Sequence, residues 1–297
     1  MGLEAVAGRR LRVCEHGRLL TTVRTLRPSA RGGSPAFLAE SKNGASAAGH
    51  GFCENVKNDR TSTVALLAAR HRIVACERCP RLRRYCTRIA REKRRAFRND
   101  TYWGRPVPGF GDPNARLLVL GLAPGAHGAN RTGRLFTGDG VGGSGDFLMS
   151  ALHRAGFANL PTSRDAHDGL RLRDAFIAAA VRCAPPDNKP MPEEIARCLP
   201  HLEAELAALP RVRVVVALGR IGFDACVRLL KRGGCVMKPR PQFGHGAMYA
   251  LLDGRVLIGC YHPSRQNTNT GRLTAAMMDE VFRAARRTLA GPKCCLP

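Results

Sequence analysis

The chain has 297 residues and a formal charge of +25, because 48 Lys and Arg face only 23 Asp and Glu. This excess of cations excludes an ordinary metabolic enzyme as the default interpretation and favours a polyanion, most often nucleic acid, as the partner. Hydrophobic residues make up 44% of the chain, enough for a folded core, and no apolar run approaches the ~18 residues that a membrane span needs.

The first 62 residues differ in composition from the rest of the chain. They are rich in Gly, Ser, Ala and Arg and have no sustained apolar period, so we expect a mostly disordered extension over residues 1–62. We expect the folded domain to cover residues 63–290, followed by a tail at 291–297. Its first helix is predicted from Thr63 to Cys76.

A second helix is predicted over residues 81–98, and it is strongly basic. It holds nine Lys and Arg against one acid, Glu92. Such a run can be a solvated helix face, but so little compensating charge favours a surface that contacts phosphates.

From Arg116 onward the pattern is of strands that alternate with helices. Apolar runs predict strands at 116–121, 211–219 and 255–260, and the run at 175–183 fits a strand or a short helix. Amphipathic spacing predicts helices at 145–157, 191–209, 220–230 and 273–290. This alternation predicts an α/β fold, a three-layer α/β/α sandwich with a mostly parallel central sheet.

Two loops follow predicted strands, where sites lie in folds of this kind. The first, GLAPGAHGANRTGRLFTGD, covers residues 121–139 and is rich in glycine. It lacks the G-K-[ST] ending of a Walker A motif and does not fit GxGxxG, so ATP binding is a poor interpretation. Its glycines instead allow a close approach of the backbone to a ligand.

The second loop, CYHPSRQNTNTG, covers residues 260–271. It places His262 directly after a strand, before the rigid Pro263 and a polar segment. A lone histidine is usually structural, but this position favours a functional role.

Together the two loops resemble the uracil-DNA glycosylase superfamily, and the similarity is greatest to its family 5 (type B) enzymes of bacteria and archaea. The segment RCAPPDNKPMPEEIARC at 182–198 is also typical of that family. The resemblance covers roughly residues 70–290 and no part of the first sixty.

The resemblance implies a four-iron, four-sulfur (4Fe-4S) cluster, and four of the twelve cysteines would hold it: Cys76, Cys79, Cys183 and Cys198. From the residues alone, zinc suits four thiolates equally well. Cys86 is a rival ligand, which we rank below Cys198.

The resemblance also implies roles for residues of the two loops. His262 would donate a hydrogen bond to charge that develops on a base carbonyl, and Phe136 would stack on the flipped base. The backbone near Gly121 and Leu122 would recognise base edges. We expect Asn130 to position water, since no acidic side chain stands in the GLAPG segment. Asn267 is a candidate for DNA contact.

The implied activity is hydrolytic removal of uracil from double-stranded DNA by a monomeric, cytoplasmic enzyme that starts base excision repair. Relatives often have Asn where this chain has Ala179. Loss of a side chain that reads the base should relax specificity, so we expect hypoxanthine and other deaminated bases to be substrates as well.

Three alternatives remain open at this point. One is a uracil-specific enzyme of family 4, although Leu122 and Ala123 stand where that family usually has an acid. Another is a DNA-binding iron–sulfur or zinc protein without catalysis. A zinc-dependent nuclease or deaminase is disfavoured, because a deaminase needs H-x-E together with P-C-x-x-C and the chain has no such pair.

Overall fold

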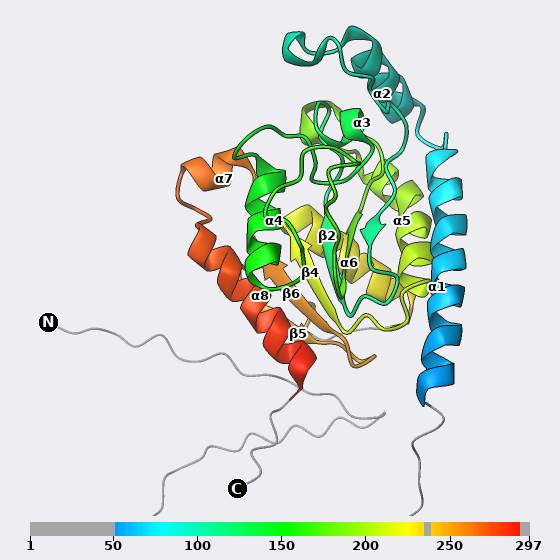
Figure 1. The fold of residues 1–297 in the computed structure, drawn as a ribbon, viewed down its shortest axis with the longest axis vertical. Helices are drawn as coiled ribbons and strands as arrows, with labels where there is room; N and C mark the ends of the chain where they lie inside the picture. Colours follow the sequence, from blue (N-terminus) through cyan, green and yellow to red (C-terminus); the bar gives the residue numbers. More distant parts are fainter. Residues whose placement is uncertain (1–50, 235–238, 292–297) are drawn as a thin grey trace, which may run out of the picture.

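A six-stranded mixed sheet forms the centre of the fold in the computed structural model, which describes residues 51–234 and 239–291 (Figure 1). The strand order is β1-β3-β2-β4-β6-β5. The strands are β1 (Phe110–Gly111), β2 (Leu117–Gly121), β3 (Ala175–Ala179), β4 (Val214–Leu218), β5 (Met248–Ala250) and β6 (Val256–Cys260). The four middle strands are parallel, and the two edge strands β1 and β5 run antiparallel to their neighbours.

The middle strands are apolar throughout because both of their faces are covered. Every residue of β2, β3 and β4 is buried, which is the usual state of a parallel sheet between helices. The segment at 175–183, which the sequence left open between strand and short helix, forms strand β3.

Helices cover both faces of the sheet (Figure 1). One apolar core joins the sheet to α4 and α8, and a second joins its other face to α5 and α6, while α1 packs outside α5. The predicted three-layer α/β/α sandwich is confirmed. The helices are α1 (Gly51–Val74), α2 (Pro80–Glu92), α3 (Ala129–Thr132), α4 (Ser144–Arg154), α5 (Pro192–Ala207), α6 (Arg220–Arg232), α7 (Arg265–Asn269) and α8 (Ala275–Ala290), with 3-10 turns η1 (Arg95–Phe97) and η2 (Pro186–Asn188).

Some boundaries differ from the sequence prediction. Helix α1 begins at Gly51, so the boundary predicted at residue 63 falls inside it. The rest of the predicted extension, residues 1–50, and the predicted tail beyond Gly291 lie outside the described residues. Among the described helices, none combines the length and the apolar character needed to cross a membrane.

The basic helix predicted over 81–98 is shorter than expected. It ends at Glu92, and Lys93 turns the chain with a left-handed φ of 55° before the turn η1. A continuous helix would have placed Arg91 beside Arg95 at i,i+4 spacing, and like charges at that spacing are unfavourable.

Candidate active site

The two predicted loops meet at the carboxyl ends of β2 and β6. The rings of Phe136, from the first loop, and His262, from the second, have centroids 5.9 Å apart with a 32° angle between their planes. The structure therefore places Phe136 and His262 side by side, and their roles toward a base stay predictions.

Two glycines make room for the side chains of Phe136 and His262. A Cβ on Gly121, the last residue of β2, would lie 2.8 Å from Phe136 Cε2 and 2.9 Å from Phe136 Cζ. A Cβ on Gly219, which follows β4 with a φ of 81°, would lie 3.3 Å from the Cβ of His262. Contacts this short leave little room for a methyl group, so the end of β2 is shaped to the ring of Phe136 and the end of β4 to the Cβ of His262.

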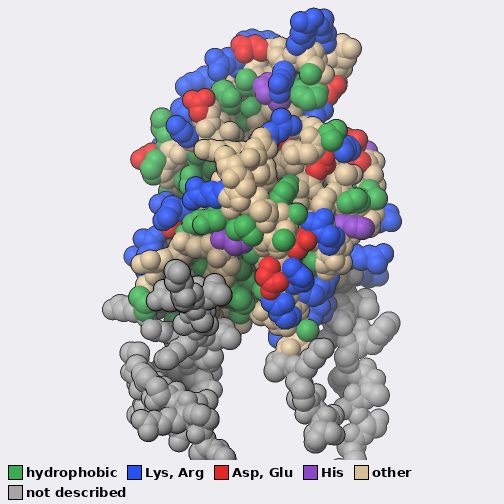
Figure 2. Space-filling view, turned by 90° about the vertical axis from the view of Figure 1, so that its left-hand side faces the viewer, with side chains coloured by type: hydrophobic (Ala, Val, Ile, Leu, Met, Phe, Trp, Pro, Cys, Tyr) green, Lys and Arg blue, Asp and Glu red, His purple; other side chains and the backbone are tan. Residues whose placement is uncertain are grey.

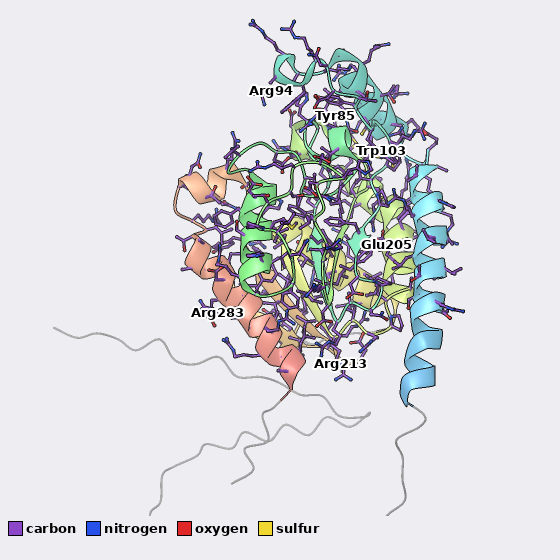
Figure 3. All side chains as sticks on the ribbon, in the orientation of Figure 1. Tyr85, Arg94, Trp103, Glu205, Arg213 and Arg283 are labelled. Atoms are coloured by element: carbon purple, nitrogen blue, oxygen red, sulfur yellow. The ribbon has the colours of Figure 1, made fainter. Side chains whose placement is uncertain are left out.

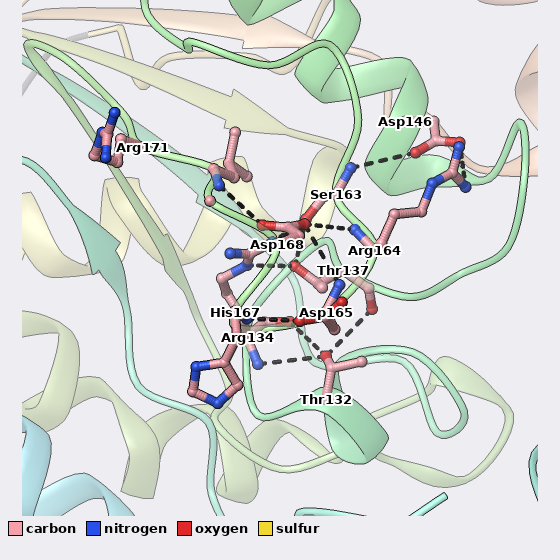
Figure 4. A network of polar contacts seen from close by, with 12 residues as sticks. Thr132, Arg134, Thr137, Asp146, Ser163, Arg164, Asp165, His167, Asp168 and Arg171 are labelled. Atoms are coloured by element: carbon pink, nitrogen blue, oxygen red, sulfur yellow. Dashed lines mark hydrogen bonds and ion pairs between the residues drawn. The ribbon is translucent and has the colours of Figure 1, made fainter.

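Phe136 has a left-handed backbone with a φ of 50°, a conformation that costs energy in a bulky residue. Buried polar contacts hold the chain on either side of it (Figure 4). The guanidinium of Arg134 donates to Thr137 Oγ1 (3.0 Å), to Ser163 Oγ (3.0 Å) and to Asp168 Oδ2 (2.6 Å). A fully satisfied buried network can maintain such a strained backbone, and so fix the direction of the ring.

His262 is partly buried, and burial lowers its pKa to about 4. The imidazole is therefore neutral at pH 7, with an N–H on one ring nitrogen. Its backbone is fixed by the following turn, because Asn267 Nδ2 donates to the His262 carbonyl at 2.9 Å. The amide of Asn267, which we expected to contact DNA, thus supports the backbone of His262 in this structure.

Asn130 lies deeper than the two rings. Its side chain is fully buried, and Nδ2 donates to the carbonyls of Ala126 (3.3 Å) and Cys86 (3.4 Å). Within the described part of the chain, its Oδ1 has no hydrogen-bond partner. The amide therefore ties the first loop to α2, while one acceptor of its side chain stays available.

The turn after β2 is held by its neighbour β3. The carbonyl of Gly121 accepts from Ala180 N (3.0 Å), and that of Leu122 accepts from Val181 N (2.9 Å). These bonds fix the start of the first loop against the end of β3, where Ala179 pairs with Gly121.

The four cysteines predicted as ligands come from separate segments that converge. Cys76 and Cys79 come just before α2, Cys183 follows β3, and Cys198 lies in α5. Three of them, Cys79, Cys183 and Cys198, share one apolar cluster. Burial, and then the nearby Cys183, raise the pKa of the Cys79 thiol, and burial raises that of Cys198 to about 12.

This donor set fits a thiophilic cation, whose charge would stabilise the thiolates that burial disfavours. Across residues 51–234 and 239–291, no group of three His, Cys, Asp or Glu side chains is arranged to hold a metal ion. Cys86, the rival ligand, is fully buried in the same cluster and donates to the Ala184 carbonyl at 3.6 Å.

The sequence analysis did not predict a buried ion pair next to Cys198. Arg182 Nη2 donates to Glu205 Oε2 at 2.6 Å, and both side chains are almost fully buried (Glu205 is labelled in Figure 3). The backbone N–H of Arg182 also donates to Cys198 Sγ at 3.3 Å. The two partners are distant in sequence, and no local pattern pairs them.

Asp139, at the end of the first loop, was also missed. Its Oδ1 fills the place that a Cβ on Gly128 would take, so the loop closes around the carboxylate. Burial raises the pKa of Asp139. Arg265 Nη2 of α7 donates to the Asp139 carbonyl at 3.5 Å, which links the two loops a second time.

Several known proteins resemble the chain in sequence. The family model described as "Uracil DNA glycosylase superfamily" matches residues 108–286. A type-5 uracil-DNA glycosylase of Mycobacterium bovis is 53% identical over 220 residues, which are 74% of this chain and 80% of the relative. A type-5 uracil-DNA glycosylase of Thermus thermophilus is 54% identical over 219 residues, 74% of this chain and 95% of the relative.

Similarity to the type-4 enzymes is weaker and shorter. A type-4 uracil-DNA glycosylase of Pyrobaculum aerophilum is 35% identical over 132 residues, 44% of this chain and 58% of the relative. The type-5 proteins therefore match more of the chain, and at higher identity, than this type-4 protein does.

Proposed function

Since the chain belongs to the uracil-DNA glycosylase superfamily, we propose that it removes uracil from DNA as a type-5 enzyme, by hydrolysis of the N-glycosidic bond. The observation that carries this proposal is the pairing of Phe136 with His262, which joins the two loops at the carboxyl ends of β2 and β6. A protein that only bound DNA through its positive charge would need neither ring in this place.

The first step is to bring the base out of the duplex, because the bond to be cleaved is not accessible in the stack. Unstacking costs a few kcal/mol, least for a mispaired base. Phe136 supplies an aromatic face on which the flipped base stacks, a contact worth about 1–3 kcal/mol for each base. Its strained backbone and the Arg134 contacts keep that face in place before the base arrives.

Cleavage leaves negative charge on the departing uracil. His262 donates a hydrogen bond to the base carbonyl on which this charge develops. The low pKa of His262, about 4, keeps it a neutral donor at physiological pH. A fixed donor of this kind contributes about 3 kcal/mol in comparable oxyanion sites. The bond from Asn267 to the His262 carbonyl holds the donor in position.

The attacking water needs an acceptor that orients it. The proposal keeps Asn130 for this role, supported by the Oδ1 atom that lacks a partner within the described residues. No step requires a strong general base if the leaving group and the cationic sugar carry most of the catalysis. Because Asn130 Nδ2 also ties the first loop to α2, the role is tested by Asn130→Asp, which keeps the acceptor and removes the donor.

The proposed substrate range is broad and includes hypoxanthine and other deaminated bases in double-stranded DNA, acted on by a monomer. Ala179, at the buried end of β3 beside Gly121, is the supporting feature. Its methyl group cannot hydrogen-bond a base. A base other than uracil therefore leaves fewer polar groups of the site unpaired, and the site rejects it less strongly.

The proposed cofactor is a 4Fe-4S cluster, held by Cys76, Cys79, Cys183 and Cys198. The thiols of three separate segments support it, since a shared cluster would cross-link the start of α2 to the β3–α5 connection. When bound, it supplies structural cross-links and no step of the reaction.

Metal analysis tests this assignment. The purified protein should contain iron and acid-labile sulfide, and Cys198→Ser should lose them. Cys226→Ser, a matched control in the separate core beside α6, should keep them. Zinc in place of iron would contradict the iron–sulfur cluster. Iron that is lost in Cys86→Ser and kept in Cys198→Ser would show that Cys86, and not Cys198, is the fourth ligand.

The substrate proposal is tested by alkaline strand cleavage of a labelled duplex with one varied base pair. The panel contains G·U, A·U, T·hypoxanthine and an undamaged pair. We expect cleavage at uracil and at hypoxanthine. Cleavage at uracil alone would contradict the broad range, and binding without any cleavage would leave a DNA-binding protein.

A further inference from the structure

Residues 80–104 form a basic arm, made of α2, η1 and the extended stretch that follows them. Six arginines of this arm are exposed: Arg84, Arg88, Arg91, Arg94, Arg95 and Arg98. The ion pairs of the arm's basic helix use other arginines, Arg81 with Glu194 and Arg83 with Glu77. Across the described residues, none of the six exposed arginines forms an ion pair with an acid of the protein.

Charges of one sign that are gathered without partners repel one another, so the arm carries a cost that a bound polyanion would remove. An ordinary solvated helix face intersperses acids with bases, whereas this arm has only two acids, Glu92 and Asp100, and Asp100 pairs with Arg131. The planar guanidinium groups suit phosphate oxygens, which they bind through two parallel hydrogen bonds. The chemistry of the arm therefore fits a chain of phosphates.

The arm is fixed to the first loop by its second half. Arg131 Nη1 donates to Asp100 Oδ2 at 2.6 Å, and the Arg131 guanidinium lies 4.0 Å from the centre of the Phe97 ring. The hydroxyl of Tyr102 and His127 Nδ1 share a hydrogen bond of 3.0 Å. The arm thus has a defined position relative to the loop that carries Phe136.

The arm stands over the end of the molecule where the site lies. Figure 1 places α2 above α3, at the same end as α7, which follows His262. In Figure 2 the uppermost side chains of that face are Lys and Arg. Figure 3 shows Arg94 at this end and Arg213 at the opposite end of the sheet.

We propose that the basic arm binds the DNA backbone beside the flipped nucleotide, as a phosphate-binding surface in addition to the two loops of the site. This inference deepens the proposed function and rests on it for the identity of the polyanion. The Arg131 contacts with Asp100 and Phe97 set the distance between the held backbone and the stacking ring of Phe136.

The test compares two triple variants of the full chain that lose the same charge. The arm variant is Arg91→Gln/Arg94→Gln/Arg98→Gln. The control variant is Arg171→Gln/Arg173→Gln/Arg213→Gln, three exposed arginines that precede β3 and β4 at the amino end of the sheet. Because all six side chains are exposed, both variants should keep the thermal midpoint of the wild type.

Binding to an undamaged DNA duplex is measured by fluorescence anisotropy from 50 to 200 mM salt, a range set by the expected counterion release. If three phosphate contacts are lost, the slope of log K against log salt should fall by about 2.7, since each contact contributes about 0.9. The affinity of the arm variant should fall about tenfold or more, and the control variant should keep the slope of the wild type.

Equal changes in the two variants would overturn the proposal, because net charge alone would explain them. An unchanged slope in the arm variant would also overturn it and leave a solvated surface. The binding measurement needs no base removal, so its result does not depend on whether the protein is a glycosylase. A wild type that binds through the arm and cleaves nothing would refute the activity and support the surface.

Discussion

The replacement Gly121→Ala tests whether the end of β2 is shaped to the ring of Phe136. The new methyl carbon would lie 2.8 and 2.9 Å from two ring carbons, about 0.6 Å inside an ordinary contact of 3.4 Å or more. Overpacking of this kind costs about 1–3 kcal/mol, while the lost backbone freedom of the unfolded chain returns about 0.4–1 kcal/mol. A modest net loss of stability should result.

The effect on activity should be larger than the effect on stability. The ring must move away from the place where the flipped base stacks, and loss of a stacking contact is worth about 1–3 kcal/mol. We therefore expect single-turnover uracil release to slow by about tenfold to a hundredfold. Gly233→Ala is the control, since its new carbon would make only an ordinary contact of 3.5 Å at the end of α6.

A double-mutant cycle shows whether the effect acts through Phe136. In a Phe136→Ala background the new methyl group has no ring to displace, so Gly121→Ala should cost little further activity. A wild-type rate for Gly121→Ala would refute the reasoning. An equal loss in both backgrounds would refute it as well, because the end of β2 would then act on the base directly.

Three further predictions concern titration and buried charge. The pKa of His262 is lowered from 6.5 to about 4, so the folded protein binds fewer protons than the unfolded chain between those values, and the stability of the fold should decrease as the pH falls from 6.5 to 4. Single-turnover rates should show no inflection near pH 6.5. An inflection near pH 6.5 that His262→Asn abolishes would contradict the lowered pKa. Arg134→Met removes the partner of the nearly buried Asp168, so urea denaturation should show a loss of about 3–5 kcal/mol, and an unchanged midpoint would count against the network. Glu205→Gln leaves the buried Arg182 guanidinium without its counter-charge and should destabilise the fold by a similar amount, about 3–5 kcal/mol; a neutral result in the same assay would show that the pair is dispensable.

The sequence predicts the parts of the fold whose pattern is local. The apolar runs before Gly121 and Leu218 form parallel strands, because burial on both faces requires unbroken hydrophobic segments. The edge strands β1 and β5 have two and three residues, too few for any period to appear. The turn α7 was likewise taken for part of a loop, since it is only five residues long.

In the candidate site too, the sequence predicts features that have a local pattern and misses contacts between distant segments. Loop position pointed to His262 and the family resemblance pointed to Phe136, and the structure places their rings side by side. The sequence did not predict ion pairs between distant segments, such as Arg131 with Asp100 or Arg134 with Asp168. Nothing in the local sequence of an arginine indicates which carboxylate it will meet.

Asn130 illustrates a limit of assigning roles by residue type. A polar side chain in the first loop suggested a group that orients water, yet its Nδ2 donates to the carbonyls of Ala126 and Cys86. An amide has a donor and an acceptor at one end, so it can tie a loop and still offer Oδ1 to another partner. Only the positions of the surrounding backbone carbonyls show that the Nδ2 donor of the amide is already hydrogen-bonded.

The central claim is that His262 supports the release of uracil from DNA. The most direct test is the single-turnover release of free uracil from a duplex with one central uracil, at saturating wild-type enzyme and at saturating His262→Ala, with the Kd for the same duplex measured in parallel. We predict that the wild type releases uracil and that His262→Ala does so about 100- to 1000-fold more slowly at an unchanged Kd. A wild type that binds the duplex without releasing uracil, or a variant as fast as the wild type, would contradict the claim.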